Sequence, residues 1–137
     1  VGFGVYFLDT NIVIKIMLRQ SETLVARFEH EIERGSPIFL SSIVFYELAY
    51  GVSKSSHPKR NFDRLSEFLT PITDIIAFDR DDALEAGDIR AELENQGLPI
   101  GPYDVQIAAQ ARRRKAVIVT NNRREFNRVP GLMRCGC

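Results

Sequence analysis

The sequence predicts an α/β domain with a mostly parallel sheet covered by helices. Short apolar runs typical of buried strands alternate with longer segments whose apolar residues recur at helical spacings of three and four. Glycine, proline, serine or asparagine marks most changes from one pattern to the other. With 137 residues, 45% of them hydrophobic and 26% charged, the chain has the length of one domain, residues 1–137, with a well-buried core.

The first half of the chain predicts two strands and four helices. A strand over residues 3–8 is followed by helices over residues 11–18 and 21–34, and "GSP" stops the second helix. "IFLSS" is a short buried strand, and its Ser41 and Ser42 can cap the helix "IVFYELAYGV". An amphipathic helix then follows "SKSSHP" and runs to Leu69.

The second half continues the alternation. "DIIAF" is a strand, "DDALEAGDIRAELENQ" is a helix that ends at Gly97, and "GPYDVQIAAQARRRK" is a helix with Pro102 in its first turn. "AVIVT" is a strand that leads into the loop "NNRREFNRVPG". Ligands of parallel sheets bind beyond the carboxyl ends of the strands, where the sequence has Asp9, Asn121 and Asn122.

Composition argues against a membrane or secreted protein. The longest apolar runs are interrupted by charge and fall far short of the roughly 20 residues that span a bilayer, and "VGFGVYFL" does not have the pattern of a signal peptide. The only cysteines, Cys135 and Cys137, would close a tiny loop if bridged, so we expect a reducing, cytoplasmic setting. His30 and His57 are interpreted as surface residues.

The net charge is zero, but the charges are unevenly distributed. Residues 79–104 hold eight acidic and two basic side chains, whereas residues 105–137 hold eight basic and one acidic. Such segments are usually solvated helix faces, although the basic one could also hold a polyanion.

Three carboxylates occupy unusual positions. Asp9 follows an apolar run directly, Glu47 has mostly apolar neighbours three and four residues away in its helix, and Asp104 begins an apolar stripe. Other acids sit among polar neighbours and are interpreted as plain solvated charges: Glu29, Glu31 and Glu33.

Each of the three also has a structural explanation. Asp9 could cap the helix that follows it, Asp104 could favour its helix N-terminus, and Glu47 could pair with an arginine. Three inward carboxylates together, however, would repel one another and would be desolvated unless protonated or neutralised. A divalent cation removes that conflict, and ligands that are all oxygen favour Mg²⁺ or Mn²⁺ over zinc.

Four motifs in order, "LDTN", "YELAYG", "GPYDVQIAAQA" and "VTNNRREF", resemble the PIN-domain ribonucleases and, within them, the VapC toxins of bacterial toxin–antitoxin pairs. The resemblance extends from Tyr6 to about Leu132. It implies a three-layer α/β/α sandwich, an acidic Mg²⁺ pocket and endonucleolytic cleavage of RNA. It also implies a VapB-type antitoxin and a homodimer within a toxin–antitoxin hetero-oligomer that binds operator DNA through the antitoxin.

The resemblance also suggests roles for individual residues. The family's first three acids match Asp9, Glu47 and Asp104, with Asp9 and Asp104 as metal ligands and Glu47 ligating directly or through water. Glu125 matches the fourth catalytic acid of relatives with "TNNxxEF", while other relatives carry Asp where this chain has Asn122, which can still orient a water or bind phosphate. Thr10 is placed to hydrogen-bond a ligand or to cap a helix. The ending "LMRCGC" departs from relatives with acidic, Trp-containing tails, so we expect it to be unusual or disordered.

Basic residues near these acids are candidates for holding RNA: Lys54, Arg123, Arg124 and Arg128. For the basic run from Arg112 to Lys115 we prefer a structural role at a helix C-terminus. The resemblance suggests a structured RNA such as tRNA as the substrate, cut to leave 5′-phosphate and 3′-hydroxyl ends. The surplus of apolar residues between Ile12 and Leu18 offers a groove for an antitoxin segment or for self-association.

Two other function classes remain open from the sequence. One is a PIN-type subunit of a DNA-binding regulatory complex with little cleavage, against which the complete set of acids and nearby basic residues argue. The other is a hydrolase of small phosphoesters, which is disfavoured because the sequence contains no Gly-rich phosphate loop.

Overall fold

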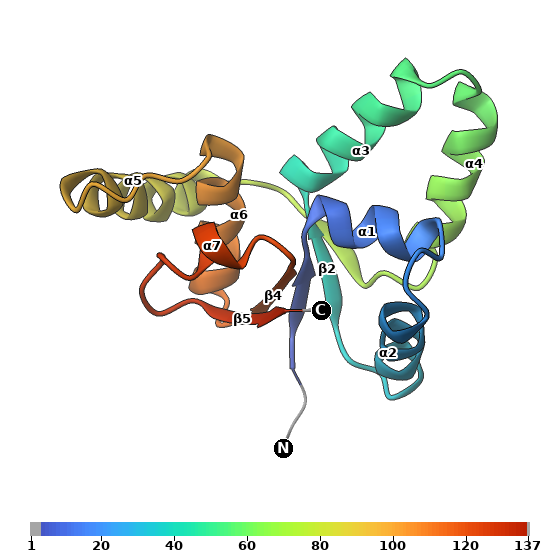
Figure 1. The fold of residues 1–137 in the computed structure, drawn as a ribbon, viewed down its shortest axis with the longest axis horizontal. Coiled ribbons are helices and arrows are strands. Elements are labelled where there is room, and N and C mark those ends of the chain that lie inside the picture. Colours follow the sequence, from blue (N-terminus) through green and yellow to red (C-terminus); the bar gives the residue numbers. More distant parts are fainter. Residues whose placement is uncertain (1–3, 137) are drawn as a thin grey trace.

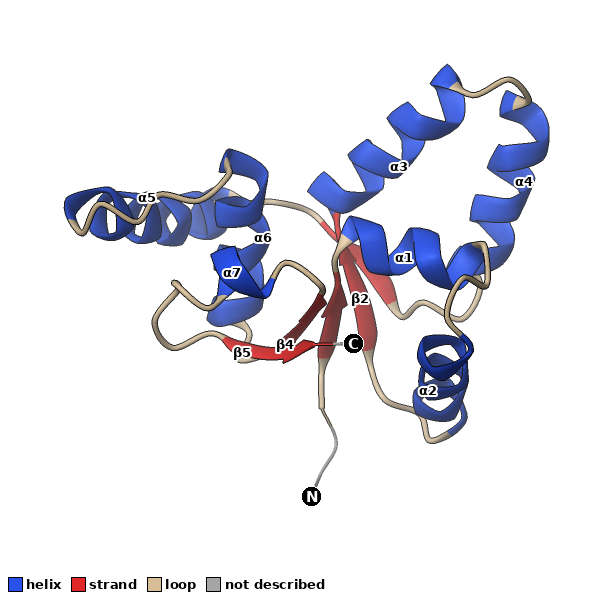
Figure 2. Cartoon of the chain, viewed as in Figure 1, coloured by secondary structure: helices blue, strands red, loops and turns tan. Residues whose placement is uncertain are grey.

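The computed structural model describes residues 4–136 and contains a five-stranded parallel sheet with helices on both sides (Figure 2). The strands are β1 (Tyr6–Leu8), β2 (Ile38–Ser41), β3 (Asp74–Ile76), β4 (Val117–Thr120) and β5 (Met133–Gly136). Their order across the sheet is β3-β2-β1-β4-β5, and every neighbouring pair is parallel. The predicted fold class and three-layer arrangement are confirmed.

The helices are α1 (Thr10–Met17), α2 (Glu22–Glu33), α3 (Ser42–Lys54), α4 (Pro58–Leu69), α5 (Arg80–Asn95), α6 (Pro102–Arg113) and α7 (Arg123–Phe126). Figure 1 shows α5, α6 and α7 on one side of the sheet and α1 and α2 on the other, with α3 and α4 extending from one end. Residue 3, the predicted start of the first strand, and Cys137 lie outside the described residues. No helix of the described chain combines the length and the apolar character needed to cross a bilayer.

The centre of the sheet is built from the most apolar strands. β1 pairs with β2 on one edge and with β4 on the other, and Phe7 lies opposite Phe39 and Ile118 with its side chain fully buried. A strand that is covered on both faces needs a continuous apolar run, and residues 5–8 supply one.

Local signals set most of the element ends. Ser41 caps α3 by accepting a hydrogen bond from the Ile43 amide at 2.9 Å. Ser42 does not share that role as predicted, because it lies inside the helix and accepts from the Phe78 amide instead. Gly97 follows α5 with a positive φ of 70°, which glycine adopts at low cost, and Pro102 opens α6 as expected.

Two elements were missed from the sequence. The predicted loop after β4 contains α7, a single turn too short for a helical periodicity and anchored by the fully buried Phe126. The C-terminal residues, expected to be unusual or disordered, form β5 instead, which pairs with β4 along Val117–Thr120. Met133 is 46% exposed at this sheet edge, so the strand lacks a clear apolar pattern.

The interpretation of Glu31 as a solvated charge was wrong. Its side chain is buried, accepts a hydrogen bond from the Ser36 hydroxyl at 2.6 Å and lies 3.7 Å from the Arg34 guanidinium. Glu29 and Glu33 are exposed as expected, as are His30 and His57. The preferred structural role of the arginines at the end of α6 is supported, because Arg112 pairs with Glu85 and the next two arginines pair with Asp82.

Candidate active site

The carboxyl end of β1 positions Asp9. Its Oδ1 accepts from the Thr10 amide at 2.8 Å, so the residue caps α1, and its Oδ2 accepts from the Thr120 hydroxyl at 2.8 Å. Thr120 ends the neighbouring strand β4, and both side chains are buried. The first residue of α1 and the last residue of β4 therefore hold the two oxygens of this carboxylate.

Glu47 joins the site from the second turn of α3. Its Oε1 accepts from the Thr10 hydroxyl at 2.8 Å, and its side chain is half-buried. The cap of α1 is Asp9 rather than Thr10, so the Thr10 hydroxyl is used across the site and not within its own helix. Thr10 thereby connects two of the predicted acids, since its amide binds Asp9.

Asp104 and Glu125 meet across the amide of Asn122. Asn122 Nδ2 donates to Asp104 Oδ2 at 3.0 Å and to Glu125 Oε2 at 2.9 Å. Glu125 Oε1 also accepts from the Gly101 amide at 3.2 Å, immediately before α6. The first turn of α6 and the single turn of α7 are thus held together by polar contacts.

The four carboxylates lie close enough to affect one another's pKa values. Burial, the hydrogen bond with Glu125 and repulsion from Asp9, Glu125 and Glu47 raise the pKa of Asp104 from 3.8 to about 8. Burial likewise raises the pKa of Asp9, although the Thr120 and Thr10 hydrogen bonds oppose this. The pKa of Glu125 is lowered, first by its hydrogen bond with Asp104. Asp104 therefore holds a proton that its ionised neighbour Glu125 accepts as a hydrogen bond.

The donor set fits a hard divalent cation. Every side chain at this site offers oxygen or an amide, and no histidine or cysteine is among them. The proton held by Asp104 marks an excess of negative charge that a cation would neutralise. Within the described residues no three acidic, histidine or cysteine side chains lie close enough together to form a metal cluster as they stand.

The basic residues predicted to hold RNA have different surroundings. Arg123 and Arg124 are exposed on α7, beside Asn122 and Glu125. Lys54 is exposed at the end of α3, where its Nζ lies 5.5 Å from the centre of the Tyr50 ring. Arg128 is half-buried and donates to the Pro99 carbonyl at 2.8 Å, which ties the loop before α6 to the segment after α7.

Sequence reasoning overlooked several side chains that contact this site. Thr120 binds Asp9 and also accepts from the Asn122 amide at 2.9 Å, and its signal was its place at the end of "AVIVT". Tyr46 and Tyr103 directly precede Glu47 and Asp104, and their rings meet edge to face with centroids 6.1 Å apart. The pKa of Tyr103 is raised, first by a hydrogen bond with Tyr46.

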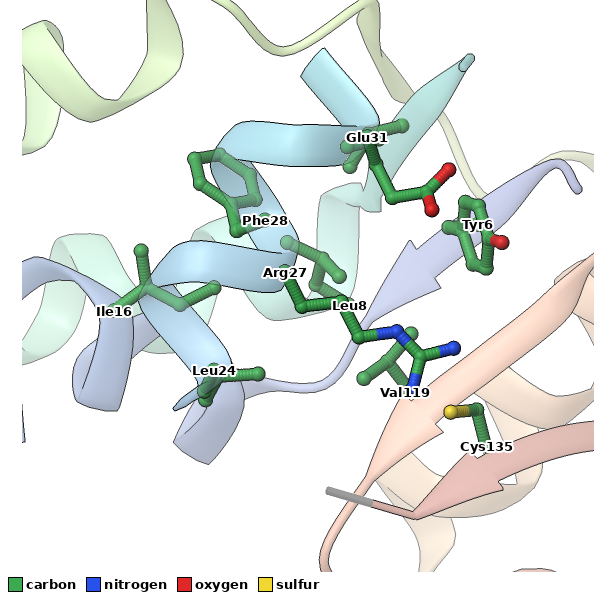
Figure 3. A pocket seen from close by; sticks show the side chains of 10 residues that line it. Tyr6, Leu8, Ile16, Leu24, Arg27, Phe28, Glu31, Val119 and Cys135 are labelled. Atoms are coloured by element: carbon green, nitrogen blue, oxygen red, sulfur yellow. The ribbon is translucent and has the colours of Figure 1, made fainter. Parts of the chain in front are cut away.

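A separate pocket lies beside α2 and holds none of the four acids (Figure 3). Its volume is about 30 Å³, far smaller than a nucleotide needs, and most of its lining is apolar. Arg27, Glu31 and Cys135 are its polar or reactive members, and Figure 3 shows them around the apolar side chains. The carboxylates therefore remain the candidate active site.

Comparison with known proteins agrees with this fold. Residues 6–132 match the PIN domain family, and the chain therefore belongs to it. Within that family, it is 42% identical over 127 residues to the tRNA(fMet)-specific endonuclease VapC of Shigella flexneri, covering 93% of each chain. The protein of the same name from Salmonella typhimurium is 40% identical over the same length and coverage. The predicted resemblance is confirmed.

Solved structures with the same fold come from toxin–antitoxin complexes. VapBC2 from Rickettsia felis, bound to a DNA fragment from its promoter, contains a chain with a TM-score of 0.89 and 36% identity that covers 97% of this chain and 98% of its own. DNA-bound VapBC from Salmonella typhimurium contains one with a TM-score of 0.87 and 39% identity, covering 96% and 97%.

Proposed function

We propose that this chain is a metal-dependent endoribonuclease toxin of the VapC type, controlled by a VapB-type antitoxin. The observation that carries the proposal is that Asp9, Glu47, Asp104 and Glu125, from four separate segments, share hydrogen-bond donors in pairs and act electrostatically on one another. Bringing acidic side chains together lowers the stability of a fold, because their charges repel. Acids that lie close together are therefore characteristic of a functional site. The names of the relatives add RNA as the substrate class.

Asp9, Asp104 and Glu47 would hold Mg²⁺, or Mn²⁺ in its place, with Glu125 close by. When bound, the cation would lower the pKa of a water molecule and stabilise the leaving oxygen of the scissile phosphate. The chain's own contribution is orientation. Thr10 and Thr120 donate to Asp9 and Glu47 and so fix the direction of these carboxylates before any ligand arrives.

Asn122 and Glu125 support the other half of the site. The Asn122 amide donates to Asp104 and to Glu125 and so orients both side chains, and the Gly101 amide holds the far oxygen of Glu125. Metal-assisted hydrolysis in line with the leaving 3′ oxygen would leave 5′-phosphate and 3′-hydroxyl ends. The exposed Arg123 and Arg124 stand beside this half and would bind backbone phosphates.

The proposed substrate is a structured RNA such as tRNA. Two relatives at 42% and 40% identity carry tRNA(fMet) in their names, and their alignments cover 93% of this chain. A nuclease of this size needs an exposed strand, so we place the cut in a loop or single-stranded segment.

The proposed partner is a VapB-type antitoxin in an assembly that contains two copies of this chain and binds operator DNA through the antitoxin. The Rickettsia felis and Salmonella typhimurium complexes support this assembly. An apolar groove of about 270 Å³ between α1, α3 and α4 would receive an antitoxin segment, with Glu47 at its edge to accept an arginine. Its apolar lining includes Ile14, Met17, Leu18, Leu48, Val52 and Leu65.

A direct test incubates the purified chain with RNA pools and with small phosphoesters, with and without Mg²⁺. Cleavage of RNA alone, abolished by EDTA, restored by Mg²⁺ or Mn²⁺ and poorly supported by Ca²⁺, is the expected result. Undiminished RNA cleavage in EDTA would contradict the metal mechanism. Hydrolysis of phosphoesters without RNA cleavage would favour a small-molecule hydrolase, and neither activity would favour a regulatory subunit.

A second test measures bacterial growth during expression of the chain alone. Growth should stop, and Asp9→Asn or co-expression of the neighbouring small gene should restore it. If the wild-type chain accumulates harmlessly and binds no product of its own operon, the toxin proposal fails and a housekeeping RNA-processing nuclease becomes the better explanation.

A further inference from the structure

Exposed aromatic side chains gather at the rim of the acidic site. Among the described residues the exposed aromatics are Tyr46, Tyr50, Tyr103 and Phe62. The first three belong to one surface, because Tyr46 and Tyr50 lie one turn apart on α3 and the Tyr46 ring packs edge to face against Tyr103 on α6. Phe62 lies apart, on α4.

This surface is continuous with the catalytic residues. Tyr46 and Tyr103 are the chain neighbours of Glu47 and Asp104, and their rings pack together. The charge of Glu47 also contributes to raising the pKa of Tyr103, after the hydrogen bond with Tyr46, so this pair of rings lies near the acids. In the other direction the stripe of Tyr46 and Tyr50 ends, after one more turn of α3, in Lys54, whose Nζ sits over the Tyr50 ring. The stripe runs for about 12 Å along the helix axis.

We propose that Tyr46, Tyr103 and Tyr50 form a base-stacking platform that holds single-stranded RNA next to the acidic site, with Lys54 binding a backbone phosphate at its outer end. This inference rests on the proposed nuclease function and names the residues that hold its substrate. These residues, exposed by 56%, 41% and 58% respectively, present part of each ring to solvent, where a base can stack.

Stacking suits this position for an electrostatic reason. The ionised acids of the site repel the phosphates of an approaching RNA strand, so binding beside them cannot depend on charge alone. A base that stacks on a neutral ring gains free energy without bringing a phosphate closer to the acids, and every base has a face that can stack. A peptide would more readily use the apolar groove between α1, α3 and α4, whose lining, among the described residues, includes no aromatic ring.

The test measures binding by fluorescence anisotropy, using a fluorescein-labelled single-stranded RNA of about ten nucleotides. Ca²⁺ replaces Mg²⁺ so that the probe stays intact. Tyr46→Ala and Tyr103→Ala should each weaken binding by roughly five- to a hundredfold, and Tyr50→Ala should weaken it by at least about fivefold. Tyr46→Phe, which keeps the ring, and the matched control Phe62→Ala should bind like the wild type.

Two further readouts separate stacking from a structural role. An internal 2-aminopurine in the probe should lose fluorescence on binding the wild type and regain it in Tyr46→Ala. Lys54→Ala should reduce the slope of log affinity against log salt by about 0.7, the value for one phosphate on a single strand.

The opposing results are equally specific. If the tyrosine variants bind RNA like the wild type while Asp9→Asn abolishes cleavage, the platform is wrong and the nuclease function stands. If Tyr46→Ala and Tyr50→Ala turn a dimer into a monomer in light scattering without weakening RNA binding, the stripe is an interface between copies. If the wild-type chain neither binds nor cleaves RNA, the proposed function itself fails.

Discussion

Asp104 and Glu125 accept hydrogen bonds from the same amide nitrogen, Asn122 Nδ2, at 3.0 and 2.9 Å. The two acids nevertheless differ in charge state, because the pKa of Asp104 is raised to about 8 while that of Glu125 is lowered. One proton is therefore held between two carboxylates at the centre of the proposed metal site. A bound cation would take the place of that proton, which links metal affinity to pH.

The first prediction concerns the acids themselves. Asp9→Asn, Glu47→Gln and Asp104→Asn should each fold and each lower the rate of RNA cleavage by about a hundredfold or more, because ligand loss removes several kcal/mol of charge stabilisation. Asp88→Asn, an exposed acid on α5, is the matched control and should cleave normally. A variant that keeps nearly full rate at saturating Mg²⁺ would remove its residue from the site.

The second prediction concerns the shared amide. Asn122→Ala leaves Asp104 and Glu125 without their common donor and should reduce cleavage by about 10- to 100-fold, as is usual for residues that orient metal ligands. Asn122→Asp should instead bind Mg²⁺ at least as tightly as the wild type in calorimetry, because it adds a carboxylate. Its metal-free form should be less stable to urea, since the added charge raises the repulsion. Equal Mg²⁺ affinity and equal activity in all three proteins would show that Asn122 has no part in the site.

The third prediction concerns pH. In the metal-free protein Asp104 keeps its proton up to about pH 8, whereas in the unfolded chain it loses it near 3.8. The folded state binds the extra proton over that interval, so the free energy of unfolding should fall as pH rises from about 4 to 8. Asp9 acts in the same direction, while Glu125 acts oppositely, since its lowered pKa adds stability that is lost only on acidification below about 4.5.

Urea unfolding in EDTA across this pH range measures the effect. Asp104→Asn cannot titrate and should give a flatter profile than the wild type. Affinity for Mg²⁺ should rise with pH up to about 8 in the wild type, because the cation competes with the proton. Parallel stability profiles for the two proteins would contradict the assignment of the proton to Asp104.

The fourth prediction concerns the fold away from the site. Asp82 is fully buried, binds Arg113 and Arg114 at 2.6 and 2.8 Å and completes a capping box with Asp79, so its pKa lies well below the usual range. Asp82→Ala should lower the free energy of unfolding by about 3 kcal/mol, because it removes the buried carboxylate that two arginines share and half of the capping box.

The matched control is Asp81→Asn, an exposed neighbour 3.7 Å from Arg113, which should change stability by no more than about 0.5 kcal/mol. Asp82 is ionised in the folded chain at any pH above its usual value, so its contribution should be complete there and should be lost only as the pH falls below about 3.8. Equal stabilities of Asp82→Ala and Asp81→Asn would contradict the role of this buried charge.

The sequence by itself determined the fold class and most of the elements. The order of strands and helices could be predicted from the sequence. Buried parallel strands need continuous apolar runs, as in residues 5–8, and helices need apolar residues every three or four positions. The positions of Asp9, Glu47 and Asp104 stood out for the same reason, since each interrupts an apolar pattern. Their catalytic roles remain predictions for the experiments above.

Tertiary structure alone decided the remaining features. α7 is too short for its apolar residues to show a helical periodicity. β5 has no apolar pattern of its own and forms because the edge of β4 offers it hydrogen-bonding groups. The turn between α2 and β2 brings Ser36 to Glu31, and this contact satisfies the buried carboxylate. No helical pattern in the sequence reveals such a contact.

The contacts that connect the acids were also decided by the tertiary structure alone. Thr10 reaches a residue 37 positions away, and Thr120 reaches one 111 positions away. A sequence pattern records the local environment of each side chain, within about one helical turn or strand. Which carboxylate shares an amide, which one keeps a proton and which tyrosines stand beside them depend on distances that exist only once the strands have paired and the helices have packed.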